Sequence, residues 1–206
     1  MALRHWEDAS VVVAGTDEAG RGCLAGPVTA AAVVLPPDYV NGMLNDSKQL
    51  TVRQRNILRA EIEREAVSWA VTHNPPGRID EINILWASVE AMQSSVGKLS
   101  VVPAMLLVDG NKFRPYAGIP YRCIVKGDAT YYEIAAASVL AKTHRDELME
   151  VMAGEYPQYC WDKNKGYPTA DHRRAIEKFG PCPLHRMSFR LLNGQTALDL
   201  CTCSGV

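Results

Sequence analysis

The feature that most limits how this chain can fold is an acidic, glycine-rich segment between two apolar runs. Residues 16–22 read Thr-Asp-Glu-Ala-Gly-Arg-Gly, after Val-Val-Val at 11–13 and before an apolar run at 28–35. We predict β-strands at residues 11–17 and 28–35, so that Asp17 and Glu18 lie at the end of a buried strand. Burying two carboxylates is unfavourable unless a proton, a cation or a metal compensates their charge. Because Arg21 is the single basic residue in the segment, the pattern favours a divalent cation.

The same segment also fits two patterns without a metal. Asp, Glu and Gly are common in surface turns, and such a turn alone has no chemical role. Gly20, Gly22 and Ala25 also match the G-x-G-x-x-[GA] pattern of dinucleotide-binding turns. That pattern requires a helix to follow directly, with its N-terminus at the pyrophosphate. Gly26-Pro27 and a predicted strand follow instead, so we reject the dinucleotide interpretation.

The rest of the chain alternates strand and helix patterns, which is typical of an α/β domain with a mixed sheet. Further strands are predicted at residues 68–72, 104–108 and 121–125, and helices at 131–152 and after Thr169. Thr51 and Gln54 form a capping-box pattern at the start of another helix, and Asp80 is expected to cap the next one. In the helix at 131–152 the predicted core stripe is Ile134, Ala137, Ala141, His144, Leu148 and Val151. Ser138, Lys142 and Arg145 share a different face of that helix.

Composition sets the class of protein. With 206 residues and 47% apolar composition, residues 1–206 can form a single domain with its own core. The net charge of −1 excludes a whole-molecule basic field, so nucleic acid would have to bind a local patch. No apolar run reaches the roughly 20 residues of a membrane span, and no signal-peptide pattern opens the chain. We therefore expect a cytoplasmic protein without a membrane partner, with its six cysteines reduced.

Four acids are expected to meet at one edge of the sheet. Asp17, Glu18 and Asp109 lie where apolar strands end, and Asp128 follows the last strand. Ligands bind at the carboxyl edge of open α/β sheets, and oxygen-only ligands favour Mg²⁺ or Mn²⁺. Two such ions about 3.5–4 Å apart can hold the attacking and leaving oxygens of a phosphoryl displacement. The candidate phosphate donors near these acids are Arg21, Lys48, Lys142 and Arg145.

Six motifs in this order resemble those of ribonuclease HII, a type 2 ribonuclease H. They are Asp-Glu-Ala-Gly-Arg-Gly (17–22), Asp-Ser-Lys (46–48), Val-Asp-Gly (108–110), Lys-Gly-Asp (126–128), Ala-Ala-Ser-Val-Leu-Ala-Lys-Thr-His-Arg (136–145) and Gly-Tyr-Pro-Thr (166–169). The resemblance covers about residues 10–189 and leaves a C-terminal tail at 190–206, to which we assign no function.

The resemblance implies a ribonuclease-H-like fold, with a five-stranded mixed sheet flanked by helices and a C-terminal helical part. It implies endonucleolytic cleavage of RNA in RNA–DNA hybrids and 5′ to single ribonucleotides embedded in duplex DNA, leaving 3′-hydroxyl and 5′-phosphate ends. The matched metal ligands and catalytic residues are Asp17, Glu18, Asp109 and Asp128, with Mn²⁺ or Mg²⁺ as the cofactor. The matched substrate-binding residues are Gly20, Arg21, Gly22, Lys48, Ser138, Lys142, Arg145 and Tyr167.

Within this set, the glycine turn at 20–22 would read the ribose 2′-hydroxyl, the group that distinguishes RNA from DNA at one nucleotide. Tyr167 would stack on the neighbouring sugar. His172 and His185 match no catalytic position, and we expect them to have core or capping roles.

Three competing functions differ from this prediction in what they require of the chain. Ribonuclease HIII, a sister family, usually carries an N-terminal domain, lacks the arginine of the glycine turn and has glutamate where Asp128 stands here, so ribonuclease HII fits better. A catalytically silent hybrid-binding protein could use the same groove, although unneeded acids would repel phosphates. Another metal-dependent phosphodiesterase would cut all-DNA duplexes equally well. We expect a monomer, and the sequence leaves the identity of any protein partner open.

Overall fold

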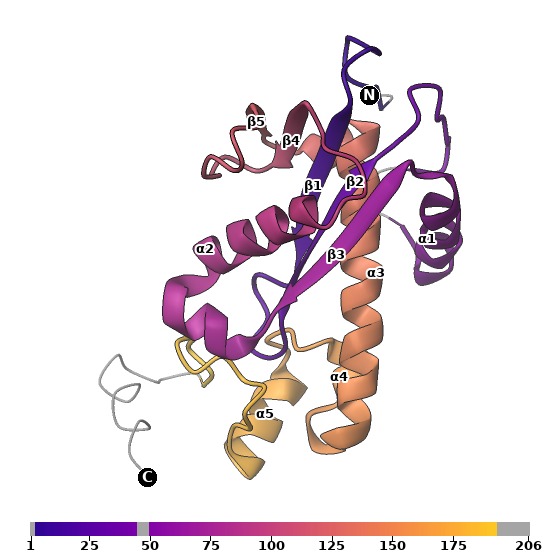
Figure 1. The fold of residues 1–206 in the computed structure, drawn as a ribbon. Helices are drawn as coiled ribbons and strands as arrows, with labels where there is room; N and C mark the ends of the chain where they lie inside the picture. Colours follow the sequence, from indigo (N-terminus) through magenta and orange to yellow (C-terminus); the bar gives the residue numbers. More distant parts are fainter. Residues whose placement is uncertain (1–2, 45–49, 193–206) are drawn as a thin grey trace.

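The computed structural model describes residues 3–44 and 50–192, and its centre is a five-stranded mixed sheet (Figure 1). The strand order is β3-β2-β1-β4-β5. The strands are β1 (Val13–Ala19), β2 (Val28–Val34), β3 (Ser68–Asn74), β4 (Met105–Asp109) and β5 (Tyr121–Ile124). The first three pair antiparallel, whereas β4 and β5 run parallel to β1. The predicted mixed α/β sheet is confirmed.

Helices cover both faces of the sheet. Figure 1 shows α2 (Pro76–Gly97) crossing one face and α3 (Tyr132–Glu155) lying along the other. Side chains alternate between the faces of a strand, and β2 follows this rule: Ala31 and Val33 pack in the α3 core, while Ala30 and Ala32 pack in the α2 core. Every residue of β2 is buried, so β1 and its acids lie beside a strand covered on both sides.

Close packing fixes the start of α3 against β1. A Cβ atom on Gly15 would lie 2.2 Å from the backbone carbon of Glu133, so only glycine permits this approach. The alanines at 135–137 are fully buried at the same contact. The helix that carries Ser138 and Lys142 is therefore held directly against the strand that carries Asp17.

The start of the second long helix differs from the prediction. The capping box of Thr51 and Gln54 is present at α1 (Val52–Glu65), but α2 begins at Pro76, upstream of Asp80. Asn83 interrupts α2 with φ 66°, and its side chain accepts hydrogen bonds from the backbone amides of Leu85 and Trp86. The expected cap at Asp80 is thus wrong: Asn83 caps the second part of the helix.

Asp80 instead ties the far end of the described chain to α2. Its carboxylate accepts hydrogen bonds from the backbone amides of Met187 and Ser188. Sequence distance concealed this partner, because the two segments are more than a hundred residues apart.

The second half of α3 also turns a different face inward. Val151, a predicted core residue, is 64% exposed, while Arg145 and Met149 are fully buried. Ala137 and Ala141 pack in the core between α3 and the sheet, whereas Met149, farther along α3, packs in the core of the C-terminal helical part. The predicted stripe is correct for Ile134, Ala137 and Ala141 and wrong at its C-terminal end.

The C-terminal helical part builds a separate core with the segment that follows β1. It contains the short helices η2 (Pro157–Tyr159) and α4 (Trp161–Asn164) and the longer α5 (Ala170–Phe179). Thr169 caps α5 as predicted, accepting a hydrogen bond from the His172 amide. Leu24 and Ala25 pack with Trp161, Ile176 and other buried residues of this part. None of the described helices is long and apolar enough to cross a membrane.

Candidate active site

Two of the predicted acids end adjacent parallel strands at the same level. The register pairs Thr16 of β1 with Val108 of β4, and the next residue on each strand is Asp17 and Asp109. Side chains at matched positions of parallel neighbours point to the same face, which here is the face covered by α3. The structure therefore brings together two carboxylates that are 92 positions apart, as the sequence predicted.

Asp17 is the buried centre of this arrangement. It lies inside the last three residues of β1 and not in the turn after it, and it is 5% exposed. Burial, and then the neighbouring charges of Glu18 and Asp109, raise the pKa of the Asp17 carboxyl well above its usual range. Hydrogen bonds from Ser138 on α3 and from the Glu18 amide oppose this rise in pKa. Three carboxylates are thus close enough to repel one another.

The other three acids lie on β1, at the end of β4 and in the segment after β5. Glu18 lies on the opposite face of β1, as strand alternation requires, and accepts a 3.1 Å hydrogen bond from Arg21. Asp109 accepts a 2.7 Å hydrogen bond from the Gly127 amide. Asp128 follows at once in the 3-10 helix η1 (Gly127–Ala129) and is 4% exposed. The Gly127 contact therefore joins the segment of the fourth acid to the end of β4.

The donor set suits a hard divalent cation. It consists of carboxylate oxygens, and the burial and neighbouring carboxylates that raise the pKa of Asp17 are conditions that a bound cation would relieve. Within residues 3–44 and 50–192, no three His, Cys, Asp or Glu side chains are grouped as a ready-made metal cage. Glu18 and Asp109 instead turn toward Arg21 and the Gly127 amide, as mutually repelling carboxylates do when nearby donors are available.

A pocket of about 250 Å³ opens next to these acids. Its walls are Glu18, Ala19, the glycine turn, Ser138, Lys142 and Tyr167. Six residues predicted from the sequence to bind substrate therefore line one pocket: Gly20, Arg21, Gly22, Ser138, Lys142 and Tyr167. The Tyr167 side chain is 39% exposed, and the Lys142 ammonium lies 5.6 Å from its ring centroid. An aromatic ring and a cation thus share the pocket with a turn in which two of the three residues lack a side chain.

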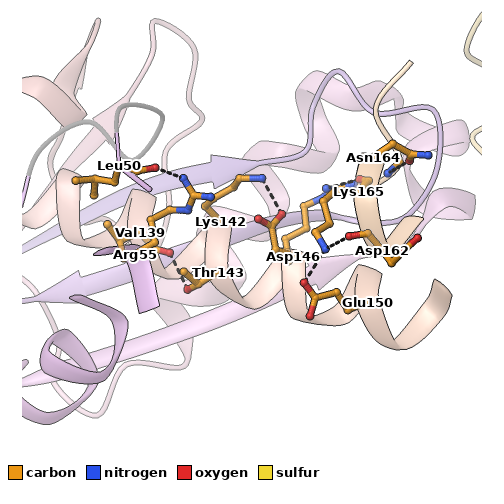
Figure 2. Close-up of polar contacts among 12 residues, drawn as sticks. Leu50, Arg55, Val139, Lys142, Thr143, Asp146, Glu150, Asp162, Asn164 and Lys165 are labelled. Atoms are coloured by element: carbon orange, nitrogen blue, oxygen red, sulfur yellow. Dashed lines mark hydrogen bonds and ion pairs between the residues drawn. The ribbon is translucent and has the colours of Figure 1, made fainter. Parts of the chain in front are cut away.

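Lys142 and Lys165 each form an ion pair with a neighbouring carboxylate. Figure 2 shows Lys142 directed at Asp146, at 2.7 Å, and Lys165 directed at Glu150, at 2.6 Å. A larger groove between α1, α3 and α4 is lined by four basic and four acidic residues: Arg55, Arg59, Lys163, Lys165, Asp146, Glu147, Glu150 and Asp162. Because its charges balance, this groove provides no basic track for phosphates.

Arg145 has a different place from the one predicted. Its side chain is fully buried and donates to the backbone oxygens of Pro27, Ala25 and Lys165. These contacts hold the guanidinium away from the pocket surface, so the structure gives it a positioning role in place of a phosphate contact. Lys48, another predicted phosphate donor, lies outside the described residues.

Beneath the pocket lies a layer of buried side chains, including Arg186 and Cys23, that was not identified from the sequence. Arg186 is fully buried and donates to the backbone oxygens of Gly26 and Arg21. Cys23, also fully buried, forms a side-chain hydrogen bond with Tyr167. His172 and His185 occupy core positions, as expected. The one sequence signal for this layer was the His-Arg-Met-Ser-Phe run at 185–189, whose basic residues lie between apolar ones.

Comparison with known sequences agrees with the motifs. The family model described as Ribonuclease HII matches residues 14–192. Ribonuclease HII of Christiangramia forsetii is 55% identical over 197 residues, which cover 96% of this chain and 100% of that protein. Ribonuclease HII of Bacteroides thetaiotaomicron is 57% identical over 190 residues, covering 92% of this chain and 95% of that protein.

Comparison with solved structures agrees with the fold. The structure of the PCNA:RNase HII complex from Archaeoglobus fulgidus superposes with a TM-score of 0.74 at 25% identity, covering 92% of this chain and 100% of that one. The sister family has the same fold but a longer chain: Bst-RNase HIII in complex with Mn²⁺ gives a TM-score of 0.69 at 18% identity, covering 90% of this chain and 69% of that one. Family model, full-length relatives and fold agree, and the chain belongs to the ribonuclease HII family of metal-dependent ribonuclease H enzymes.

Proposed function

We propose that this enzyme cleaves RNA–DNA hybrids and cuts on the 5′ side of single ribonucleotides embedded in duplex DNA, by hydrolysis that uses two divalent ions. The observation that carries the proposal is the pairing of a buried carboxylate centre with the pocket beside it. Asp17 and Asp109 end neighbouring strands, and the pocket bounded by the glycine turn and Tyr167 begins at Glu18. We infer that one edge of the sheet provides both a cation-binding site and a pocket that binds a sugar.

Asp17, Glu18, Asp109 and Asp128 would hold the ions, and we propose Mg²⁺ or Mn²⁺. When bound, the ions would lower the pKa of the attacking water and neutralise the developing charge on the phosphate. Products would carry 3′-hydroxyl and 5′-phosphate ends. Mn²⁺ in the Bst-RNase HIII structure supports the choice of cation, as does the oxygen-only donor set.

Selectivity would come from the pocket walls. Gly20 has φ 89°, a conformation that glycine adopts readily, and Gly22, which also lines the pocket, has no side chain to cover its backbone. Backbone amides and carbonyls can then hydrogen-bond a 2′-hydroxyl directly. Tyr167 would pack on the neighbouring sugar, and Lys142 would contact a phosphate once that phosphate competes with Asp146.

The proposal is tested with three duplexes of one sequence: an all-DNA duplex, a duplex with one ribonucleotide and an RNA–DNA hybrid. Each is incubated with Mg²⁺, Mn²⁺ or EDTA. We expect cleavage of the two ribose-containing duplexes with either metal and none in EDTA, with a 5′-phosphate on the downstream product. Binding without cleavage would identify a silent hybrid-binding protein. Equal cleavage of all-DNA duplex would indicate a general phosphodiesterase.

A further inference from the structure

Two arginine side chains that the proposed chemistry does not use lie buried beneath the glycine turn. Arg186 donates from Nε to the Gly26 oxygen at 3.0 Å and from Nη1 to the Arg21 oxygen at 2.9 Å. Arg145 donates to the oxygens of Ala25 and Pro27, and from Nη1 to the Lys165 oxygen at 2.9 Å. The segment from Arg21 to Pro27 thus rests on two guanidinium groups that bind its backbone.

The contact between the turn and Arg145 is close enough to exclude a side chain at Gly20. A Cβ atom on Gly20 would lie 2.0 Å from Arg145 Nε. A Cβ atom on Gly26 would lie 2.2 Å from Met149 Sδ. Gly20 and Gly26 therefore leave the space that the buried Arg145 and Met149 side chains occupy beneath this segment.

Keeping Arg186 in this place costs free energy. Burial, with the nearby charge of Arg145, lowers the pKa of Arg186 to about 10. Its Nη2 has no hydrogen-bond partner among the described residues. A buried cation of this kind is often less stabilising than a packed apolar side chain. Its carbonyl contacts therefore point to a purpose other than stability, since a planar fork of donors can fix two backbone oxygens at once.

The two arginines also connect opposite walls of the pocket. Arg186 reaches the Arg21 carbonyl in one wall, and Arg145 reaches the Lys165 carbonyl, two residues before Tyr167 in the other. The backbone of the C-terminal segment strengthens this link, because the Arg186 amide donates to the Leu24 oxygen and the Gly26 amide donates to the Leu184 oxygen. The width of the pocket thus depends on buried groups that never face the substrate.

We propose that Arg186, together with Arg145, is a positioning residue that sets selectivity for ribose by fixing the glycine turn and its distance from Tyr167. This inference rests on the proposed function. Neither guanidinium contacts substrate. Without the arginine hydrogen bonds, the pocket would still bind nucleic acid, but the amides and carbonyls of the turn would no longer lie at hydrogen-bonding distance from a 2′-hydroxyl. Displacements of about 1 Å are sufficient to lose such contacts.

The test measures binding, so that selectivity is separated from cleavage. Each protein carries Asp109→Asn to prevent cleavage, and Kd is measured with Mg²⁺ for a duplex containing one ribonucleotide and for the matching all-DNA duplex. The variants are Arg186→Gln and Arg186→Lys, and thermal melting checks that each is folded. Arg190→Gln is the matched control, because Arg190 lies on the same segment with an exposed side chain.

We expect the parent to bind the ribonucleotide duplex more tightly than the DNA duplex. Arg186→Gln should reduce this preference by about tenfold, or abolish it, with the Kd for DNA unchanged. Arg186→Lys keeps the charge but loses the fork, and should also reduce the preference; it serves as the test variant if Arg186→Gln does not fold. Arg190→Gln should retain the parent preference.

A folded Arg186 variant with the parent preference would overturn the inference and leave the proposed function standing. An equal loss of affinity for both duplexes would also overturn it, because that is the result of a merely structural role. A parent without any preference for ribose would instead overturn the proposed recognition, and the inference with it.

Discussion

At the scale of single residues, Asp17 explains most of what this site can do. Its carboxyl is buried beside Glu18 and Asp109, and burial is the first cause of its raised pKa. A protein gains no stability from such crowding, so the residue is explained by the cation it would bind. The neighbouring donors, Ser138 and the Glu18 amide, orient the carboxylate without neutralising it.

Removing the charge of Asp17 should therefore abolish activity without weakening the fold. We expect Asp17→Asn to cleave a duplex with one ribonucleotide at below about 1% of the wild-type rate. In EDTA its melting temperature should equal or exceed that of the wild type, because repulsion with Glu18 and Asp109 is relieved. Asp171→Asn, at an exposed position of α5, is the control for both measurements. Wild-type cleavage by Asp17→Asn would contradict the assignment.

We expect the Tyr167 side chain to contribute to substrate binding and to contribute little to the stability of the fold. Its ring is partly exposed in the pocket, and its hydroxyl bonds to Cys23. We expect Tyr167→Ala to lower kcat/KM on a single-ribonucleotide duplex by about tenfold, the order of one aromatic contact, with a small change in melting temperature. Tyr167→Phe keeps the ring and should retain more activity than Tyr167→Ala. An unchanged kcat/KM in Tyr167→Ala would remove Tyr167 from the site.

At the scale of elements, α5 and the segment after it are joined to the pocket by a chain of neutral histidines. The Cys182 amide donates to His185 Nδ1 at 3.0 Å, and Trp161 Nε1 donates to His172 Nε2 at 3.0 Å, so each ring accepts a hydrogen bond at one nitrogen. His185 Nε2 lies 3.2 Å from His172 Nε2. His172 then donates from Nδ1 to the Tyr167 oxygen at 2.9 Å. An added proton on either ring would break this order of donors and acceptors.

Acid should therefore weaken the C-terminal helical part. Burial lowers the pKa of His172, and burial with the neighbouring His172 lowers the pKa of His185 to about 4. Because the unfolded chain takes up protons at the ordinary histidine pKa of 6.5, this stability is complete above pH 6.5 and is lost as the pH falls toward 4. For His185 the loss is about 3 kcal/mol.

Urea unfolding between pH 7.5 and pH 4.5 measures this loss. Burial also lowers the pKa of His73 and His144, so the comparison is made with His185→Gln, which keeps those two groups. We expect a shallower decline of the unfolding free energy with falling pH in His185→Gln. Identical declines in the two proteins would show that His185 is not buried as a neutral ring.

The sequence predicted the elements best where the pattern was local. The capping box at Thr51 and the side-chain cap at Thr169 depend on neighbours in the chain, and both helices begin as expected. Asp80 and Arg145 were misplaced because their partners are distant: the amides after Arg186 for one, the carbonyls after Leu24 for the other. A helix stripe shows which side chains are apolar, and it cannot show that a buried face contains an arginine that binds backbone oxygens.

At the scale of the whole molecule, the site is assembled from segments spread over 150 positions. β1 brings Asp17 and Glu18, β4 brings Asp109, η1 brings Asp128, and the loop after α4 brings Tyr167. The meeting of Asp17 and Asp109 could be predicted because each lies near the end of an apolar strand and the strands share a sheet. The layer beneath the pocket could not, since nothing local to Arg186 indicates that it would underlie a turn some 160 residues earlier.

The central claim is that folding collects these acids into one cation-binding centre beside the ribose pocket. The most direct measurement is the anomalous scattering of Mn²⁺ in a crystal of the enzyme bound to a duplex with one ribonucleotide, made uncleavable by a methylene group in place of the leaving 3′-oxygen. We predict Mn²⁺ peaks about 2.1 Å from carboxylate oxygens of Asp17 and Asp109, next to a phosphate oxygen of the nucleotide held between the glycine turn and Tyr167. Mn²⁺ bound elsewhere, with Asp17 and Asp109 contacting only protein, would contradict the account.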